Sequence, residues 1–189
     1  MSLTPVPQGH LAAVVTYLEM LEPPQAAPLP ESPLALVARP DSSPEQYRNL
    51  FRKVGAPWLW FSRLAMDDAR LSSAIGELYA IVDAAGVEVG MIELDFSVPG
   101  ECELAFIGLV PELAGKGHGR WLLAEALRLA WRDSIRRVHV HTCTLDHPAA
   151  LAAYRRAGFA PIKRAIETFP DPRLSGFLPT DSAPHWPLV

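Results

Sequence analysis

The chain has 189 residues, which is enough for one domain with a single hydrophobic core. Hydrophobic residues make up 49% and charged residues 20%, and the net charge of −4 gives no sign of a general affinity for nucleic acid or anionic membranes. The sequence has no apolar run of about 18 residues and no signal-peptide pattern at its start, so we expect a cytoplasmic protein. Its two cysteines define no disulfide framework.

The first part of the chain predicts two strands followed by helices. Residues 11–20 are rich in β-branched and apolar side chains, and residues 34–39 form a second such stretch after a proline-rich connection. Asp41-Ser42-Ser43-Pro44 is a helix-start signal that precedes apolar residues at helical spacing. An aromatic cluster at residues 58–61 is followed by a weaker helical pattern that continues to Ile75.

The middle of the chain predicts an antiparallel meander followed by a long helix. Two turn signals, Ala85-Gly86 and Pro99-Gly100, separate three apolar stretches. These stretches cover residues 78–82, 87–96 and 104–110. After Pro111 apolar residues recur at three- and four-residue steps, so an amphipathic helix opens at the following glycines and continues to Trp131.

The last regular part predicts a strand, a helix and a strand. Residues 138–144 are the first strand, and residues 148–157 are a short helix that Asp146 or His147 caps. A glycine ends this helix, and residues 159–169 form a last, broken strand. The full order predicts an α/β (α+β) fold with a mixed, mainly antiparallel central sheet that helices cover on both faces.

A glycine-rich turn lies between a predicted strand and the long helix. Residues 114–120 read Ala-Gly-Lys-Gly-His-Gly-Arg. The first amides of such a helix have no internal partner and lie at the positive end of the helix dipole, and glycines let an anion approach them closely. Lys116, His118 and Arg120 add positive charge. We therefore interpret the turn as a phosphate-binding site, with a loop that binds no ligand as the alternative.

The spacing of this turn excludes two common nucleotide sites. A P-loop requires Gly-Lys-Ser/Thr, whereas Lys116 is followed by Gly117. The dinucleotide-binding motif requires Gly-x-Gly-x-x-Gly early in a βαβ unit and an acidic residue about 20 positions later, and this pattern is absent. The turn is therefore neither of these two nucleotide sites.

A second motif follows one helix and one strand later. Residues 146–159 read Asp-His-Pro-Ala-Ala-Leu-Ala-Ala-Tyr-Arg-Arg-Ala-Gly-Phe. Together the two segments resemble the GNAT N-acetyltransferase superfamily, whose acetyl-CoA motif reads Gln/Arg-x-x-Gly-x-Gly/Ala and whose next motif ends in Tyr-x-x-x-Gly-Phe. The resemblance is good over residues 78–159 and loose before them. It implies the acyl-CoA-binding fold of that family, in which two central strands splay apart.

The resemblance also implies where acetyl-CoA binds. Leu109 and Val110 would end the strand beside the pantetheine, and one of their amides would polarise the thioester carbonyl. Asp146 and Ala150 belong to the second motif and would line the same site. Tyr154 would protonate the departing CoA thiolate. The pyrophosphate would bind the amides of Gly115, Lys116, Gly117, His118, Gly119 and Arg120.

One family residue is replaced, and the general base is less clearly marked. Ala114 stands where the acetyl-CoA motif has Gln or Arg, so a side-chain contact to the pyrophosphate is missing. Glu103 lies 11 residues before Ala114, the offset at which histone acetyltransferases of this superfamily carry a catalytic glutamate, and it would accept the amine proton. An exposed strand carboxylate without a catalytic role is the alternative, and Glu93 and Glu101 are the other candidates.

Three side chains on one predicted strand have two interpretations. His139, His141 and Cys143 alternate, so they share one face, and their nitrogen and sulfur atoms suit a metal site. We favour a face that packs under a helix or lines the acyl-CoA gap, with Cys143 as a small apolar filler. The prediction therefore includes no metal.

The aromatic cluster also has two interpretations. It lies where the family builds its acceptor-binding loop, and an aromatic and acidic wall would bind a cationic amine. Core packing is the more common role for such residues. The members of this group are Trp58, Trp60, Phe61, Asp67 and Asp68.

These features predict an acetyl-CoA-dependent N-acetyltransferase, an acyltransferase that acts directly on a primary amine of a small molecule or peptide. A non-catalytic acyl-CoA-binding or regulatory module on the same fold is the alternative. We expect an unidentified amine acceptor and no nucleic-acid or membrane partner, and the resemblance leaves a homodimer open. One domain would span 1–189, with proline-rich strands and connections at 1–44, acceptor-side helices at 45–77, the acetyl-CoA-binding core at 78–169 and a proline-rich tail at 170–189.

Overall fold

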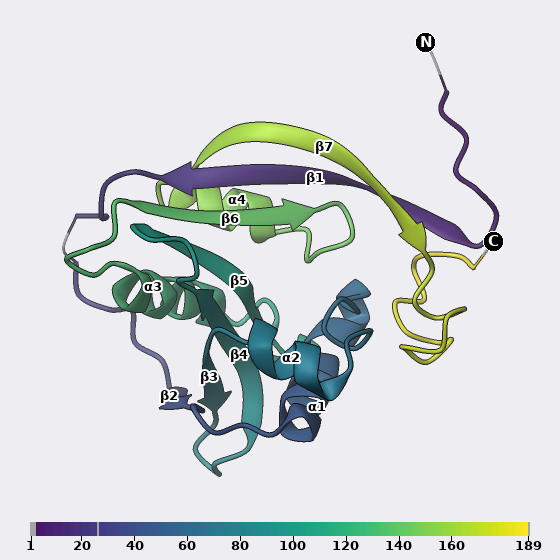
Figure 1. Ribbon diagram of the computed structural model, residues 1–189. Coiled ribbons are helices and arrows are strands. Elements are labelled where there is room, and N and C mark those ends of the chain that lie inside the picture. The colour runs from purple at the N-terminus through teal and green to yellow at the C-terminus, as the bar shows by residue number, and fades with distance from the viewer. Residues whose placement is uncertain (1–2, 26, 189) are drawn as a thin grey trace.

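A single sheet of seven strands runs through the protein (Figure 1). The computed structural model describes residues 3–25 and 27–188. The strands are β1 His10–Met20, β2 Ala35–Ala38, β3 Glu77–Val82, β4 Glu88–Asp95, β5 Glu101–Leu109, β6 Arg137–Cys143 and β7 Ala160–Pro170. They lie side by side in the order β2-β3-β4-β5-β6-β1-β7.

The two central strands of this sheet are parallel and separate from each other. The other neighbouring strands pair antiparallel, whereas β5 and β6 run in the same direction. Beyond Glu103 of β5 the two strands have no paired residues and diverge. The predicted mixed, mainly antiparallel sheet with splayed central strands is therefore confirmed. The register of the parallel part consists of Glu101 with Arg137, Cys102 with Val138 and Glu103 with His139.

Helices cover both faces of the sheet, as predicted (Figure 1). α1 (Pro44–Gly55) and α2 (Asp68–Ala74) lie on one face, and α3 (His118–Ala130) and α4 (Ala150–Arg156) lie on the other. α1 begins at the expected place because Ser43 accepts a hydrogen bond from the amide of Gln46 at 3.2 Å, a contact typical of helix N-termini. The apolar stripe of this helix is buried, as its spacing indicates, and it comprises Tyr47, Leu50, Phe51 and Val54.

Two predicted strands differ from the structure, one in its first residue and the other in its continuity. β5 begins at Glu101 rather than Leu104. Cys102 and Leu104 are both buried, so the alternation of buried and exposed side chains that is typical of a strand begins before Leu104. The last strand is not broken: β7 pairs with β1 along its length, and a single register shift opposite Tyr17 absorbs the irregularity.

The short helix α4 also begins later than predicted, and neither proposed residue is its N-cap. The cap position is Ala149, which has no side-chain hydrogen bond to offer. The Asp146 carboxylate is bonded elsewhere, as described below. Nδ1 of His147 instead accepts a hydrogen bond from the Ala149 amide at 3.1 Å, and this bond stabilises the turn that precedes the helix.

A buried charge network joins α1 to the sheet. The Glu93 side chain on β4 has no exposed surface and accepts a hydrogen bond at Oε2 from the hydroxyl of Tyr47. Its other oxygen lies 2.6 Å from Nη2 of Arg63. Burial and the neighbouring Glu93 raise the pKa of Tyr47, so this phenol stays protonated and donates. The network satisfies a carboxylate that would otherwise be buried without partners.

A buried guanidinium holds the irregular C-terminal segment that follows β7. Arg173 pairs with Asp171, with 2.7 Å between Nη2 and Oδ2, and the two side chains are 1% and 3% exposed. Arg173 also donates to the carbonyl of Trp186 at 2.7 Å. Burial raises the pKa of Asp171, but the hydrogen bonds and charge of Arg173 outweigh this and hold that pKa below its ordinary value. The segment thereby stays where Phe177 stacks on Phe61, with ring centroids 6.3 Å apart.

Replacing this guanidinium should destabilise the protein strongly. Arg173→Met should lower the free energy of unfolding by about 3–5 kcal/mol, because Asp171 is left buried without a counter-charge. Urea denaturation at neutral pH measures the loss. Arg39→Met is the control, since it removes a half-exposed pair with Glu88 that is expected to contribute about 0–1 kcal/mol. Equal losses in the two variants would contradict the special role of Arg173.

Candidate functional site

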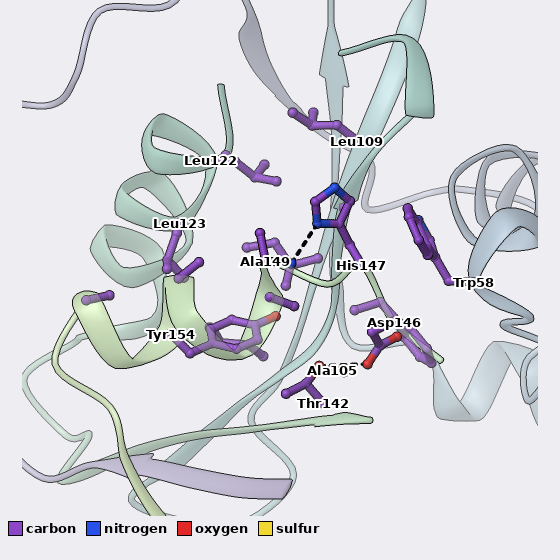
Figure 2. A pocket seen from close by; sticks show the side chains of 18 of the residues that line it. Trp58, Ala105, Leu109, Leu122, Leu123, Thr142, Asp146, His147, Ala149 and Tyr154 are labelled. Atoms are coloured by element: carbon purple, nitrogen blue, oxygen red, sulfur yellow. Dashed lines mark hydrogen bonds between the residues drawn. The ribbon is translucent and has the colours of Figure 1, made fainter. Parts of the chain in front are cut away.

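One large cavity follows the gap between β5 and β6. Its volume is about 1600 Å³, and it is lined by the glycine-rich turn, the splayed strand ends, the segment after α1, and β7. Figure 2 shows Tyr154 and Leu123 on one side of this space and Trp58 and Asp146 on the other. Segments far apart in the sequence therefore meet at the point where the two central strands stop pairing.

The glycine-rich turn leaves an open backbone surface at the start of α3. Gly115 and Gly117 have φ angles of 73° and 85°, values that favour glycine, and Gly117 is the N-cap of the helix. A Cβ atom added at Gly115, Gly117 or Gly119 would meet nothing within 4 Å. The space beside the start of α3 is therefore open, and the amides of a first helical turn are the groups that can bind a phosphate there.

The charged side chains of this turn do not all reach the cavity. Arg120 lines it, as does Ala114, the residue at the first motif position. Lys116 and His118 are not among the lining residues. His118 instead lies with Nδ1 3.4 Å from Oγ of Ser32, in the proline-rich connection before β2. Neither Lys116 nor His118 therefore forms part of the cavity wall.

The end of β5 directs one free amide toward the gap. Val110 donates its N–H to the carbonyl of Val89 at 2.9 Å, so this amide is already used. In an antiparallel ladder the residues that bond to a given neighbour alternate. Leu109, the register partner of Gly90, therefore directs its N–H away from β4. Of the two amides predicted to polarise a thioester carbonyl, only that of Leu109 faces the gap.

Tyr154 presents its side chain to the cavity from α4 (Figure 2). The residue is 8% exposed, and its ring packs edge-on against Phe159 at 5.8 Å. Burial, followed by the nearby Asp146 carboxylate, raises its pKa, so the phenol keeps its proton. Among the described residues, no side-chain or backbone group forms a hydrogen bond with its hydroxyl. This proton is therefore free to be donated to a ligand.

Asp146 connects three parts of the site. Its Oδ2 accepts hydrogen bonds from the Thr142 hydroxyl and the Cys143 amide, both at 2.8 Å. Its Oδ1 accepts from Nε1 of Trp60 at 2.9 Å, and this bond joins the turn after β6 to the segment after α1. Asp146 lines the cavity, as does Ala150, the first residue of α4. The role that its bonds indicate is positioning of the surrounding walls.

Only one of the three candidate base carboxylates reaches the cavity. Glu103 lines it and lies with Oε1 3.0 Å from Nδ1 of His141. The hydrogen bond with His141 lowers the pKa of Glu103, although burial opposes this effect. Glu93 is enclosed in the network with Tyr47 and Arg63, and Glu101 is bonded to Arg137 at 2.6 Å. Neither of these two carboxylates lines the cavity.

The aromatic cluster lines the cavity, but its neighbouring aspartates do not. Trp58, Trp60 and Phe61 all contribute to the wall. Asp67 instead caps α2 by accepting from the Arg70 amide at 2.8 Å, and Asp68 forms an ion pair with Arg48 at 2.6 Å. The predicted acidic wall was therefore assigned to the wrong residues, because Asp67 is used as a helix cap and Asp68 in an ion pair with Arg48. Acidic residues that do line the cavity include Asp95, Glu103 and Glu167.

The three alternating side chains of β6 share a face, and two of them line the cavity. His141 and Cys143 belong to the lining, whereas His139 lies 3.6 Å from Glu101 outside it. Burial raises the pKa of Cys143 to about 11, so the thiol is protonated. Within residues 3–25 and 27–188 no cluster of three or more His, Cys, Asp or Glu side chains is arranged to hold a metal ion. In the same part of the chain, no helix combines the length and apolarity needed to cross a membrane.

Several lining residues carried no motif in the sequence. Glu167 and Phe169 reach the cavity because β7 returns beside β1. Ala105 lies at a bulge, where the register between β4 and β5 shifts. Bulges are frequent beside functional sites because they redirect the strand. A bulge has no reliable sequence signal. A change in the alternation of apolar and polar residues along the strand is the pattern that could indicate one.

Comparisons with known proteins agree with this architecture. The model of the family described as "Acetyltransferase (GNAT) family" matches residues 44–159, more than half of the chain. A comparison with curated proteins finds no significant match.

Solved structures with the same fold include three acetyltransferases. The GCN5-related N-acetyltransferase from Sphaerobacter thermophilus has a TM-score of 0.58 and 19% identity, over 85% of this chain and 53% of that chain. The one from Kribbella flavida has a TM-score of 0.52 and 19% identity, over 89% and 63%. Spermidine N-acetyltransferase from Vibrio cholerae, in complex with CoA and spermine, has a TM-score of 0.53 and 20% identity, over 73% and 96%.

At these identities the structural likeness concerns the fold alone, and this chain covers 53% and 63% of the first two structures. The family model, in contrast, spans both the segment of the glycine-rich turn and the segment that carries Tyr154. On the strength of that match, the chain belongs to the GNAT acetyltransferase family.

Proposed function

We propose that this protein is an acetyl-CoA-dependent N-acetyltransferase that transfers the acetyl group directly to a primary amine. The observation that carries the proposal is the continuity of the cavity. It extends from the open amides at the start of α3, through the gap between β5 and β6, to an aromatic and acidic wall beyond the gap. A donor and an acceptor can therefore meet between the splayed strands without a covalent enzyme intermediate.

The donor half of the cavity suits the parts of acetyl-CoA in sequence. The amides from Gly115 to Arg120 would bind the pyrophosphate, although Ala114 adds no polar side chain. The free edge of β5 offers hydrogen bonds to the pantetheine amides, as a neighbouring strand would. The Leu109 amide would stabilise the negative charge that develops on the thioester oxygen during attack. Tyr154 would then protonate the departing sulfur.

The acceptor half favours a cationic amine. Trp60, Phe61 and Phe169 provide aromatic surface in the wall, and aromatic faces attract cations. Asp95, Glu103 and Glu167 add negative charge to the same cavity. The positive side chain in this region, Arg63, is already paired with Glu93. These features support a small amine or an amino-terminal peptide as the acceptor more than an anionic molecule.

Acetylation of a panel of amines tests the proposal directly. Purified protein and acetyl-CoA are incubated with amino acids, polyamines, aromatic amines and peptides, and products are detected by mass spectrometry. Polyamines are included because the Vibrio cholerae neighbour is named for spermidine. We expect CoA release coupled to acetylation of at least one cationic amine. Stoichiometric CoA binding without acetylation of any amine would instead support a non-catalytic acyl-CoA-binding module.

A negative charge at the start of α3 should abolish CoA binding. Gly119→Glu is the preferred variant, because a side chain at Gly119 meets open space and requires no positive φ. Gly117 is less suitable, since its φ of 85° would strain any other residue. Repulsion of the pyrophosphate should weaken binding at least about tenfold, as measured by calorimetry. Gly119→Gln separates bulk from charge, and a folded Glu variant with normal affinity would contradict the placement of the pyrophosphate.

Removing the hydroxyl of Tyr154 should slow transfer without weakening CoA binding. Positioned acids contribute about 10²–10⁴-fold to rate, and Tyr154→Phe should lie near the low end because a thiolate is a good leaving group. The measurement is kcat with the best amine of the panel, together with CoA affinity. Tyr79→Phe is the matched control, since its hydroxyl bonds Glu77 outside the cavity. Undiminished turnover in a folded Tyr154→Phe variant would assign this residue to the core.

A further inference from the structure

A carboxylate and an imidazole meet where β5 and β6 stop pairing. Glu103 is the last residue of β5 in the parallel register, opposite His139. His141 lies two positions further along β6 on the same face, beyond the last pair. Both side chains line the cavity, whereas His139 does not. The divergence of the strands therefore exposes this one pair to a ligand in the gap.

The contact between the two side chains defines which nitrogen of His141 is free. Nδ1 lies 3.0 Å from Oε1 of Glu103. An ionised carboxylate only accepts hydrogen bonds, so Nδ1 must carry the proton that is shared. In the neutral ring Nε2 then has an unshared electron pair, and no described residue forms a hydrogen bond with it. Glu103, in contrast, is already engaged through one oxygen.

We propose that His141 is the general base of the transfer reaction and that Glu103 is a positioning residue, an inference that rests on the proposed function. Nε2 of His141 takes one proton from the bound ammonium group and passes it to solvent. The neutral amine attacks the thioester carbon, a C–N bond forms, and the C–S bond breaks. Tyr154 gives its proton to the departing sulfur. The amine nitrogen then loses its second proton, and this proton returns to the Tyr154 oxygen. Each turnover therefore forms one amide and one CoA thiol and releases one proton to solvent.

The placement of the two proton-transfer groups fits this division of roles. His141 and Cys143 share one face of β6, and the intervening Thr142 is buried on the other. Tyr154 belongs to α4, one of the helices that cover this second face. A thioester held between β5 and β6 would therefore have the base on the acceptor side and the acid on the donor side.

The surroundings of His141 raise its pKa above the ordinary value of an imidazole. The hydrogen bond with Glu103 raises the pKa of His141, while burial opposes this effect. The charges of Asp146 and Glu167 act in the same direction as Glu103. Tyr17 of β1 packs against the imidazole with ring centroids 5.8 Å apart, and Lys163 of β7 lies 5.2 Å from the Tyr17 ring. The neutral form, which is the active one, is gained as pH rises through this pKa.

Kinetics of three variants test the assignment. His141→Asn keeps a donor for Glu103 but removes the basic nitrogen, so kcat should fall by about 10²-fold or more while CoA affinity is kept. His139→Asn is the matched control, since it alters the same face of the same strand outside the cavity. Glu103→Gln should have a smaller effect on kcat. It should also move the acidic limb of the pH profile to lower pH, because loss of the carboxylate charge lowers the pKa of His141.

A spectroscopic measurement tests the geometry without any acceptor. Long-range ¹H–¹⁵N NMR of the CoA-loaded protein should show the Nδ1–H tautomer of His141, with an upward-shifted titration that moves down in Glu103→Gln. An Nε2–H tautomer would overturn the proposal, because the lone pair would then belong to the nitrogen beside Glu103. Normal turnover by His141→Asn would overturn it as well, and a larger loss in Glu103→Gln would make Glu103 the base. Failure of the proposed function would differ from these results, since wild-type protein would then acetylate no amine.

Discussion

The divergence of β5 from β6 is the constraint on which the rest of this structure depends. Parallel strands normally exchange hydrogen bonds along their length, but here the register ends at Glu103 and His139. The edges beyond that point have backbone groups that require other partners. The cavity lies along these edges, and the pantetheine amides of the proposed donor would supply such partners. The same divergence exposes Leu109 on one strand and His141 on the other.

Polar contacts between distant segments keep the walls of this cavity in place. Asp146 joins the turn after β6 to Trp60, and Glu93 joins β4 to Arg63 in the same segment. Outside the cavity, the buried Arg173 holds the C-terminal segment together by pairing with Asp171 and donating to the Trp186 carbonyl. Removal of one partner from such a site leaves a buried charge or acceptor unpaired, which is strongly unfavourable. The walls of the cavity are therefore supported by buried polar contacts between segments that are far apart in the sequence.

Burial and pairing give the titratable groups of the cavity different protonation states. Tyr154 is buried beside a carboxylate, and both effects raise its pKa and keep it protonated. Glu103 and His141 stabilise each other's charged forms, so the pKa of the carboxyl falls and that of the imidazole rises. Tyr154 therefore keeps its proton, whereas the neutral form of His141 is gained as pH rises through its raised pKa, and the proposed transfer uses these two states.

The sequence alone determined the order of elements, the glycine-rich turn and the position of Tyr154, because these depend on local spacing and turn chemistry. It also identified Glu103 as a candidate, but it did not identify the partner of that carboxylate. Only the tertiary structure decided that Asp68 pairs with Arg48 rather than lining the cavity, that Glu93 is enclosed, and that Glu103 meets His141. Those outcomes depend on strand register and on which neighbours compete for each carboxylate, and neither is encoded in the spacing of a single segment.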